Sequence, residues 1–205
     1  MKILIAGYGF VGRAHEEILK NSHNIHIYDP ALGYTEMLSN PDGAIICVST
    51  PQHESGACNI NNVAEVVSSI NSDVPILIKS TISLEGWQYL KQLCPDHHLA
   101  FSPEFLRAKT AIEDLKETRE IFLGGDGVAF WHTVFRFAFD DKHFATTKRP
   151  VEELILAKYF RNSFLATKVA FFNQVYDLCE ATGLNYEKVI EVVGADDRIG
   201  YSHTF

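Results

Sequence analysis

The chain has 205 residues, and 46% of them are hydrophobic, which is enough for one core of ordinary size and a smaller second unit. Its formal net charge of −8 argues against a nucleic-acid or anionic-membrane partner. Residue 2 already starts an apolar strand, and no apolar run approaches a membrane span, so we expect a cytoplasmic protein without a signal peptide. Neither the histidines nor the four cysteines (Cys47, Cys58, Cys94 and Cys179) show metal-ligand spacing, so no metal site is predicted.

The N-terminal stretch predicts a strand, a helix and a second strand. Residues 2–6 form an apolar run that suits a buried strand and is too short for a helix. Residues 11–20 have the pattern of a helix, and residues 25–28 form a second apolar run that ends at Asp29. The spacing G-x-G-x-x-G lies between the first strand and the helix.

This glycine spacing, in this context, predicts a dinucleotide-binding turn. Gly7 allows the tight turn, Gly9 leaves room for a pyrophosphate, and Gly12 lets helix and strand pack closely. The helix start offers free N–H groups to the phosphates. Asp29 can accept both ribose hydroxyls of an adenosine and would repel a 2′-phosphate, so NAD is favoured over NADP. A fold of this type that has lost its ligand is the alternative.

Strands and helices alternate in the prediction up to about residue 148. Strands are expected at residues 43–49, 75–79, 99–102, 120–123 and 143–146; helices are expected at residues 61–70, 84–93 and 127–139, in a stretch ending near 116, and for two turns within 31–40. This alternation predicts an α/β fold with a doubly wound parallel sheet, in which ligands bind at the carboxyl ends of the strands. The residues at those ends are polar or glycine each time: Gly7, Asp29, Ser49-Thr50, Ser80-Thr81 and Ser102 to Glu104.

The pattern changes after residue 148, where a helical region of residues 149–205 is expected to follow a domain of residues 1–148. Residues 151–182 contain no glycine or proline and predict one long helix. The helix is apolar on more than one face, so a second surface must cover it, either a further domain or the partner in a homodimer. A shorter helix at residues 185–193 and an irregular tail follow.

Several stretches of the chain recur together and in this order in one family. They are GYGFVG, Ser49-Thr50-Pro51, Lys79-Ser80-Thr81, SPEFLR at residues 102–107, ELILAKYFRNSFLATKVAFFN and GLNYEKVIEVVGADDRIGYSH. With them the chain resembles the UDP-glucose/GDP-mannose dehydrogenases, which oxidise the C6 alcohol of a nucleotide sugar to a carboxylate in two steps, reducing two NAD⁺. The resemblance covers nearly the whole chain. It implies a Rossmann domain, NAD as cofactor, and UDP-glucose as the favoured substrate.

The resemblance also implies roles for individual residues. NAD would be held by Gly7, Gly9, Phe10, Val11, Gly12 and Asp29, with Ser49, Thr50 and Thr81 on the nicotinamide side. Thr81 matches a threonine that positions a catalytic water, and Glu104 matches a glutamate implicated in hydrolysis of the acyl intermediate. Phe105, Leu106 and Arg107 match the loop that touches the substrate sugar.

Lys158 and Asn162 match the pair that stabilises negative charge on the C6 oxygen. Their i, i+4 spacing puts both on one helix face, where a cation and a donor can aim at one oxyanion. Taken singly, Lys158 also fits a solvated lysine, and Glu104 an acid near a helix N-terminus.

The chain departs from the family pattern in three places. Ala108 stands where the family has a second glutamate. The cysteine segment GxGGxCxPKD does not occur in the 205 residues, and neither does the nucleotide-sugar domain expected after it. Because the second oxidation needs that thiolate, we do not expect this chain to complete the four-electron reaction. A non-catalytic NAD-binding, dimerising protein is one alternative. A 6-phosphogluconate or β-hydroxyacid type dehydrogenase is another, against which PEFLR and RIGYSH weigh.

Overall fold

The computed structural model describes residues 1–139 and 144–204. A seven-stranded sheet has the order β2-β1-β3-β4-β5-β6-β7. Its strands are β1 (Lys2–Ala6), β2 (Asn24–Tyr28), β3 (Gly43–Ile46), β4 (Ile76–Ile78), β5 (Leu99–Phe101), β6 (Glu120–Gly125) and β7 (Ala145–Lys148). The helices are α1 (Phe10–Leu19), α2 (Asn61–Ser68), α3 (Leu84–Leu93), α4 (Ala111–Lys116), α5 (Val128–Phe139), α6 (Val151–Thr182) and α7 (Tyr186–Gly194), with one 3-10 turn at Pro30–Leu32. The predicted doubly wound α/β fold is confirmed.

The sheet is parallel from β2 to β5, but β6 pairs antiparallel with β5, and β7 runs parallel to β6. The expected all-parallel sheet is therefore corrected at this point. The reason lies in α4, which has six residues and is about 9 Å long. A helix of that length does not return the chain to the opposite edge of the sheet, so β6 starts at the edge where β5 ended.

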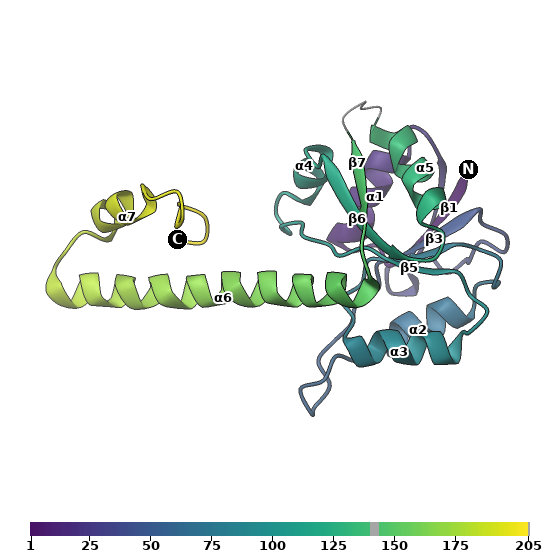
Figure 1. The fold of residues 1–205 in the computed structure, drawn as a ribbon, viewed down its shortest axis with the longest axis horizontal. Coiled ribbons are helices and arrows are strands. Elements are labelled where there is room, and N and C mark those ends of the chain that lie inside the picture. The colour runs from purple at the N-terminus through teal and green to yellow at the C-terminus, as the bar shows by residue number, and fades with distance from the viewer. Residues whose placement is uncertain (140–143, 205) are drawn as a thin grey trace. The chain divides into compact units, whose positions relative to one another are not determined.

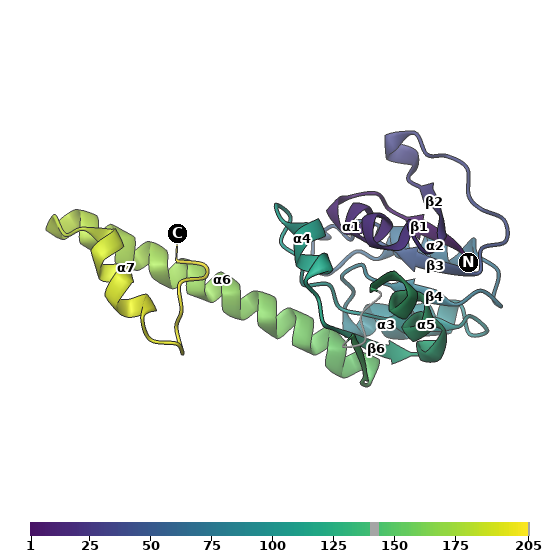
Figure 2. The ribbon, with the colours of Figure 1, turned by 90° about the horizontal axis from the view of Figure 1, so that it is seen from above.

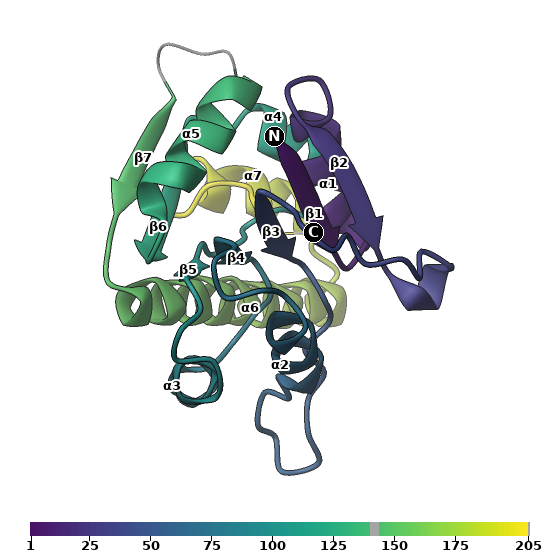
Figure 3. The ribbon, with the colours of Figure 1, turned by 90° about the vertical axis from the view of Figure 1, so that its right-hand side faces the viewer.

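Helices cover both faces of the sheet (Figures 1 and 3). On one face α2 and α3 bury Val63, Val67 and Trp87 against strand residues such as Leu4 and Ile46. The other face packs against the aromatic side of α5 and against α1. Together they form a buried cluster of Ile3, Ile5, Leu19, Ile45, Leu77, Trp131 and Phe135. Burial on both faces explains why the central strands read as continuous apolar runs.

Several predicted elements differ from the structure. β3 ends at Ile46, although the strand was expected to reach Ser49. The two helical turns expected within residues 31–40 are replaced by the single 3-10 turn, which Gly33 ends with a φ of +87°. This segment follows β2 at the edge of the sheet (Figure 2). Part of the strand expected at 143–146 lies outside the described residues, and β7 begins at Ala145.

The chain divides into two compact units, Met1–Leu156 and Ala157–Phe205. The domain boundary expected near residue 148 stays a prediction. In the second unit α7 and the tail lie along α6 (Figures 1 and 2), where the Lys168 Nζ atom donates to the Ile199 carbonyl at 2.6 Å. Within the part of the chain that the structure describes, no helix is both long and apolar enough to cross a bilayer.

Candidate functional site

The glycine-rich turn lies where the strand order reverses, because β1 has β2 on one side and β3 on the other. Ligands of doubly wound sheets bind at such a point. Gly7 has a φ of +91°, and a Cβ there would lie 2.5 Å from the Cys47 carbonyl carbon. A Cβ on Gly12 would lie 2.1 Å from the Gly7 carbonyl oxygen. Both contacts are with backbone, so the turn and the close helix–strand packing require glycine at these two positions.

Gly9 is different, because a Cβ there would meet no atom within 4 Å. Gly9 is also the N-cap of α1; it offers no side chain to the first N–H groups, and the first turn of the helix has no acid. Open space before an uncapped helix start is what a phosphate needs. The residues of this turn therefore fit a dinucleotide.

Asp29 is tied to the same turn. Its Oδ2 atom accepts a hydrogen bond from the Tyr8 N–H at 2.7 Å, which holds the carboxylate beside the glycines, where an adenosine ribose would lie. The Tyr8 hydroxyl donates to Glu16, and this bond raises the pKa of Tyr8 to about 12. The Arg13 side chain, which sequence reasoning did not single out, lies over the Tyr8 ring with its guanidinium carbon 4.8 Å from the centroid.

The loops after β3 and β4 carry the residues expected on the nicotinamide side. The Ser49 carbonyl accepts from the Asn62 amide at 3.0 Å. Thr50 and Thr81 are half-buried, and the Thr81 carbonyl accepts from the Cys58 thiol at 3.4 Å. These bonds fix the backbone of both loops at the carboxyl edge of the sheet. Their contact with a nicotinamide stays a prediction.

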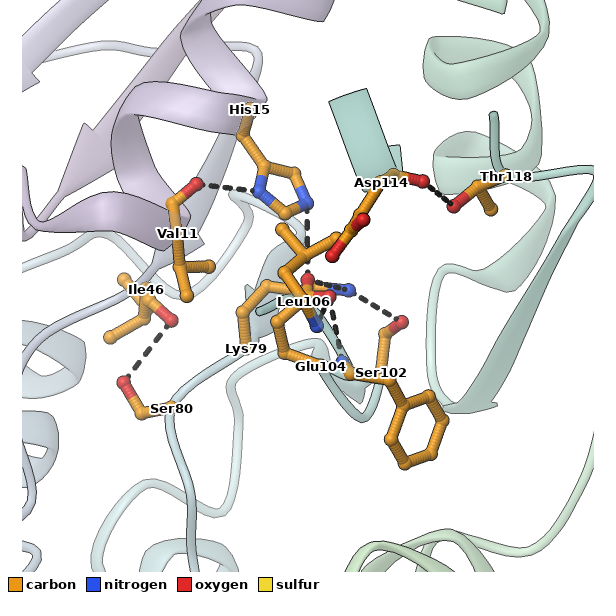
Figure 4. A network of polar contacts seen from close by, with 11 residues as sticks. Val11, His15, Ile46, Lys79, Ser80, Ser102, Glu104, Leu106, Asp114 and Thr118 are labelled. Carbon is orange, nitrogen blue, oxygen red and sulfur yellow. Dashed lines mark hydrogen bonds and ion pairs between the residues drawn. The ribbon is translucent and has the colours of Figure 1, made fainter. Parts of the chain in front are cut away.

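Four polar side chains meet in a buried cluster at the carboxyl ends of β4 and β5 (Figure 4). Lys79 follows β4, Ser102 and Glu104 follow β5, and His15 comes from α1. The Lys79 Nζ atom lies 3.1 Å from Glu104 Oε2 and donates to Ser102 Oγ at 3.0 Å. Glu104 Oε1 accepts from the N–H groups of Phe105 and Leu106, at 2.8 and 3.2 Å.

Lys79 decides the charge of Glu104. The Glu104 side chain is only 9% exposed and that of Lys79 is 3% exposed, so each needs the other's charge. Burial by itself raises the pKa of Glu104, but the Lys79 ammonium and the Phe105 N–H outweigh it, and the net pKa lies below the usual value. Glu104 is therefore an ionised carboxylate at neutral pH.

His15 is fully buried and neutral. Burial lowers the pKa of His15 to about 4, and the Lys79 ammonium contributes to this lowering. Its Nδ1 atom lies 2.9 Å from the Val11 carbonyl, and its Nε2 atom lies 3.8 Å from Glu104 Oε2. Sequence reasoning gave His15 no role. The available signal was its place on the buried face of α1, otherwise made of Gly12, Ala14, Ile18 and Leu19.

The loop after Glu104 holds the residues expected to touch a sugar. Arg107 forms a fork with Asp114, with Nη2 2.5 Å from Oδ1 and Nε 3.1 Å from Oδ2. The Arg107 guanidinium holds the pKa of Asp114 well below its usual range. Because α4 begins only at Ala111, Glu104 is not a helix N-terminal acid, and that alternative is wrong. Sugar contacts by Phe105, Leu106 and Arg107 stay a prediction.

Lys158 and Asn162 lie one turn apart on α6, in the second unit. Lys158 is 6% exposed, so the solvated-lysine alternative is wrong, whereas Asn162 is exposed. Their approach to the residues of the first unit stays a prediction. Among the described residues, no group of three or more histidine, cysteine or acidic side chains could hold a metal ion.

Two family models match the chain. The model of the UDP-glucose/GDP-mannose dehydrogenase family, NAD binding domain, matches residues 13–133, and the model of the central domain of the same family matches residues 153–205. The glycine turn itself precedes the first matched range.

Individual proteins similar to this chain are named as enzymes of the same family. The UDP-glucose 6-dehydrogenase of Rickettsia felis is 35% identical over 179 residues, covering 82% of this chain and 40% of the relative. That of Campylobacter jejuni is 28% identical over 242 residues, covering 98% of this chain and 61% of the relative. The chain thus spans between two fifths and three fifths of the length of these relatives.

Solved structures share the fold. The UDP-glucose dehydrogenase of Pyrobaculum islandicum has a TM-score of 0.80 at 21% identity, over 99% of this chain and 58% of that one. The 3-hydroxyisobutyrate dehydrogenase of Mycobacterium tuberculosis has a TM-score of 0.70 at 17% identity, over 95% of this chain and 70% of that one. At these identities the likeness extends to the fold alone.

Proposed function

The chain belongs to the UDP-glucose/GDP-mannose dehydrogenase family, and on this premise we propose that it serves NAD-dependent oxidation of a nucleotide sugar at C6. The observation that supports this most is the open, uncapped turn at Gly9 in the same unit as the buried Lys79–Glu104 pair. UDP-glucose is the favoured substrate, because the similar proteins of Rickettsia and Campylobacter are named UDP-glucose 6-dehydrogenases.

In this proposal each residue has a distinct role. The N–H groups at the start of α1 bind the pyrophosphate, and Asp29 accepts the adenosine ribose hydroxyls. Bound there, NAD⁺ supplies the hydride acceptor. Glu104, kept ionised by Lys79, is a base that accepts a proton from a hydroxyl or a water. Lys158 and Asn162 stabilise the negative oxygen, and one such donor is worth about 3 kcal/mol of barrier.

The full four-electron oxidation is not expected of these 205 residues. Its second half needs a thiolate, and none of the four cysteines lies in the motif that the reaction requires. Cys94 and Cys179 are moreover buried. A non-catalytic NAD-binding protein therefore stays the second candidate for this chain on its own.

A β-hydroxyacid dehydrogenase is the weaker alternative. The fold permits it, as the mycobacterial structure illustrates. The family models match the NAD-binding and central regions of nucleotide-sugar dehydrogenases instead, and they include the segment with RIGYSH.

We also propose that the chain dimerises through one face of α6. Phe160, Phe164, Phe171 and Leu178 are spaced by 4, 7 and 7 positions and so form a single stripe. They are 68%, 67%, 59% and 63% exposed. A neighbouring face of the helix, about 100° around from the stripe, is covered, since Phe172 and Cys179 are each only 3% exposed. A second copy offers the same apolar stripe.

The test is binding, measured by calorimetry and by thermal shift with NAD⁺, NADP⁺ and UDP-glucose in turn. We expect NAD⁺ to bind and stabilise the chain, and NADP⁺ to bind at least tenfold more weakly because Asp29 repels the 2′-phosphate. Gly9→Ala should weaken NAD⁺ binding without unfolding the chain, since the new methyl enters open space. Absence of NAD⁺ binding to the folded wild-type chain would refute the proposal. Binding of NAD⁺ without UDP-glucose would mean that these residues hold an intact cofactor site and no sugar-nucleotide site, whereas binding of both would mean that the sugar-nucleotide site is built from residues present here.

A further inference from the structure

His15 is a buried titratable group for which the proposed function has no use. It lies three residues after Gly12 on α1, the helix that follows the glycine turn. Its side chain is 0% exposed. A histidine that only filled space would have both ring nitrogens satisfied or would be replaced by an apolar side chain. In the described structure its Nε2 atom is buried without a hydrogen-bond partner.

The tautomer of His15 follows from its contacts. The Val11 carbonyl oxygen can only accept, so the Nδ1 atom at 2.9 Å carries the proton. The neutral ring therefore has a bare lone pair on Nε2. That lone pair points towards Glu104 Oε2 at 3.8 Å, as Figure 4 shows.

Glu104 Oε2 is the buried acceptor that faces this lone pair, and no hydrogen bond joins the two atoms. The Lys79 ammonium pairs with this oxygen at 3.1 Å and also donates to Ser102 Oγ, since it has three N–H groups. Two acceptor atoms thus face each other with no hydrogen between them. A proton placed on either atom would turn this repulsive contact into a hydrogen bond.

The elements that pack against His15 bring charged and uncharged groups near its ring. β4 contributes Lys79, and the loop after β5 contributes Glu104. α5 contributes the Phe135 ring, 6.1 Å away and uncharged. On α4, Asp114 is paired with Arg107, and on α1 the acids Glu16 and Glu17 pair with Tyr8 and Lys20. Within the described part of the chain, Lys79 and Glu104 are the ionic neighbours of the ring.

We propose that His15 Nε2 and Glu104 Oε2 together form a binding site for one proton, which Lys79 keeps empty in the resting protein. Filling the site forms one N–H or O–H bond and changes the charge of the Lys79–Glu104–His15 cluster from zero to +1. Adding negative charge near the cluster, or removing positive charge, favours proton uptake.

The role of this proton site rests on the proposed function. A proton that Glu104 accepts from a reacting hydroxyl or water has a second place on His15, directly behind the carboxylate. His15 is then a positioning and proton-holding residue that acts through Glu104. Gly9 is the N-cap of α1, and Gly12 and His15 lie within this helix. A ligand bound at the glycine turn therefore contacts the same helix that holds the proton site.

The first test needs no ligand: the His15 imidazole is followed by nitrogen-15 NMR from pH 8 to pH 3. We expect Nδ1 protonated and Nε2 bare at neutral pH, with Nε2 taking up a proton near pH 4. Glu104→Gln removes the carboxylate and should lower this midpoint by roughly one unit or more. Nε2 already protonated at neutral pH, or a midpoint unmoved in Glu104→Gln, would overturn the proposal.

The second test measures proton uptake on binding of NAD⁺ and of NADH, by calorimetry at pH 5.5 in two buffers of different ionisation enthalpy. NADH lacks the positive ring charge, so the wild type should take up more protons with NADH than with NAD⁺. His15→Gln keeps a polar side chain that cannot titrate, and should abolish most of that difference. Equal uptake with the two dinucleotides in the wild type would overturn the coupling. No binding of either one refutes the proposed function, and the NMR titration still decides the proton site.

Discussion

Lys79 and Glu104 place a cation and an anion together in the interior where β4 and β5 end. Neither side chain is more than 9% exposed. A buried pair gains little over an apolar pair of the same shape, but loss of one partner leaves an uncompensated charge. The pair therefore provides an ionised carboxylate, and stability alone does not explain it.

We predict that Lys79→Met destabilises the chain by about 3 to 5 kcal/mol, because the Glu104 carboxylate then stays buried without its cation. The measurement is urea unfolding at neutral pH. Adding Glu104→Gln to the same chain should recover part of the loss, since no buried charge remains. Fully additive losses from the two substitutions would show that the pair is not coupled.

His15 should make stability depend on pH. Its pKa is about 4 in the folded chain against an ordinary value of 6.5, so between these values the unfolded chain binds the extra proton. Stability therefore falls as the pH falls from 6.5 towards 4, by on the order of 3 kcal/mol in total. Glu104, with a lowered pKa, adds its own loss only below its ordinary value of 4.5.

The check is unfolding by urea at several pH values between 5 and 6.5, in the wild type, His15→Gln and His15→Leu. Both variants lack the titrating ring and should show a flatter dependence than the wild type. The glutamine variant separates titration from polarity. An unchanged slope in both variants would contradict the assignment of a neutral His15.

At the scale of elements, two glycines of the turn are needed for different reasons. Gly12 is required by packing, since a Cβ would lie 2.1 Å from the Gly7 carbonyl oxygen, whereas a Cβ at Gly9 meets nothing. We predict that Gly12→Ala destabilises the chain by about 2 kcal/mol or more. Gly9→Ala should stay within about 1 kcal/mol of the wild type, the ordinary cost of alanine at an N-cap. Thermal unfolding of the two variants, side by side, measures both; equal losses would contradict this division.

Local patterns were enough to predict the helices with clear start and stop signals. α3 begins and ends at the predicted residues, with the Ser83 hydroxyl accepting from the Gly86 N–H at 3.0 Å. α6 also has the predicted bounds. β3 was predicted too long because its end is set by partners elsewhere: its last residue, Ile46, pairs with Ala6 of β1 and Ile78 of β4. The antiparallel direction of β6 likewise depends on its pairing with β5, which the local sequence does not indicate.

The site was predictable to the extent that it lies in continuous motifs. The glycine turn, Asp29 and Glu104 are each visible in the sequence. In the sequence Lys79 is visible only as part of the Lys79-Ser80-Thr81 motif, and its pairing with Glu104 arises because β4 and β5 are adjacent. His15 joins them from α1, across the sheet order, and no spacing in the sequence encodes that meeting.

At the scale of the whole molecule, α6 has two different apolar faces. Sequence reasoning described it as apolar nearly all round. The structure separates a buried face, with Phe172 and Cys179, from the exposed stripe around Phe164. A contiguous stripe of large, exposed apolar side chains marks an interaction surface. An identical stripe on a second copy can pack against it without introducing any polar mismatch.

We predict that the chain sediments as a dimer at micromolar concentration and that Phe164→Glu converts it to a monomer, because Phe164 is 67% exposed on the stripe and the carboxylate cannot be buried there. Ala166→Glu is the matched control: Ala166 is exposed on the same helix, and two positions turn it about 200° away from Phe164. It adds the same charge and should leave the dimer intact. Sedimentation velocity over a range of concentrations measures all three chains. A wild-type monomer at every concentration, or a dimer in Phe164→Glu, would show that this stripe is covered by something other than a second copy.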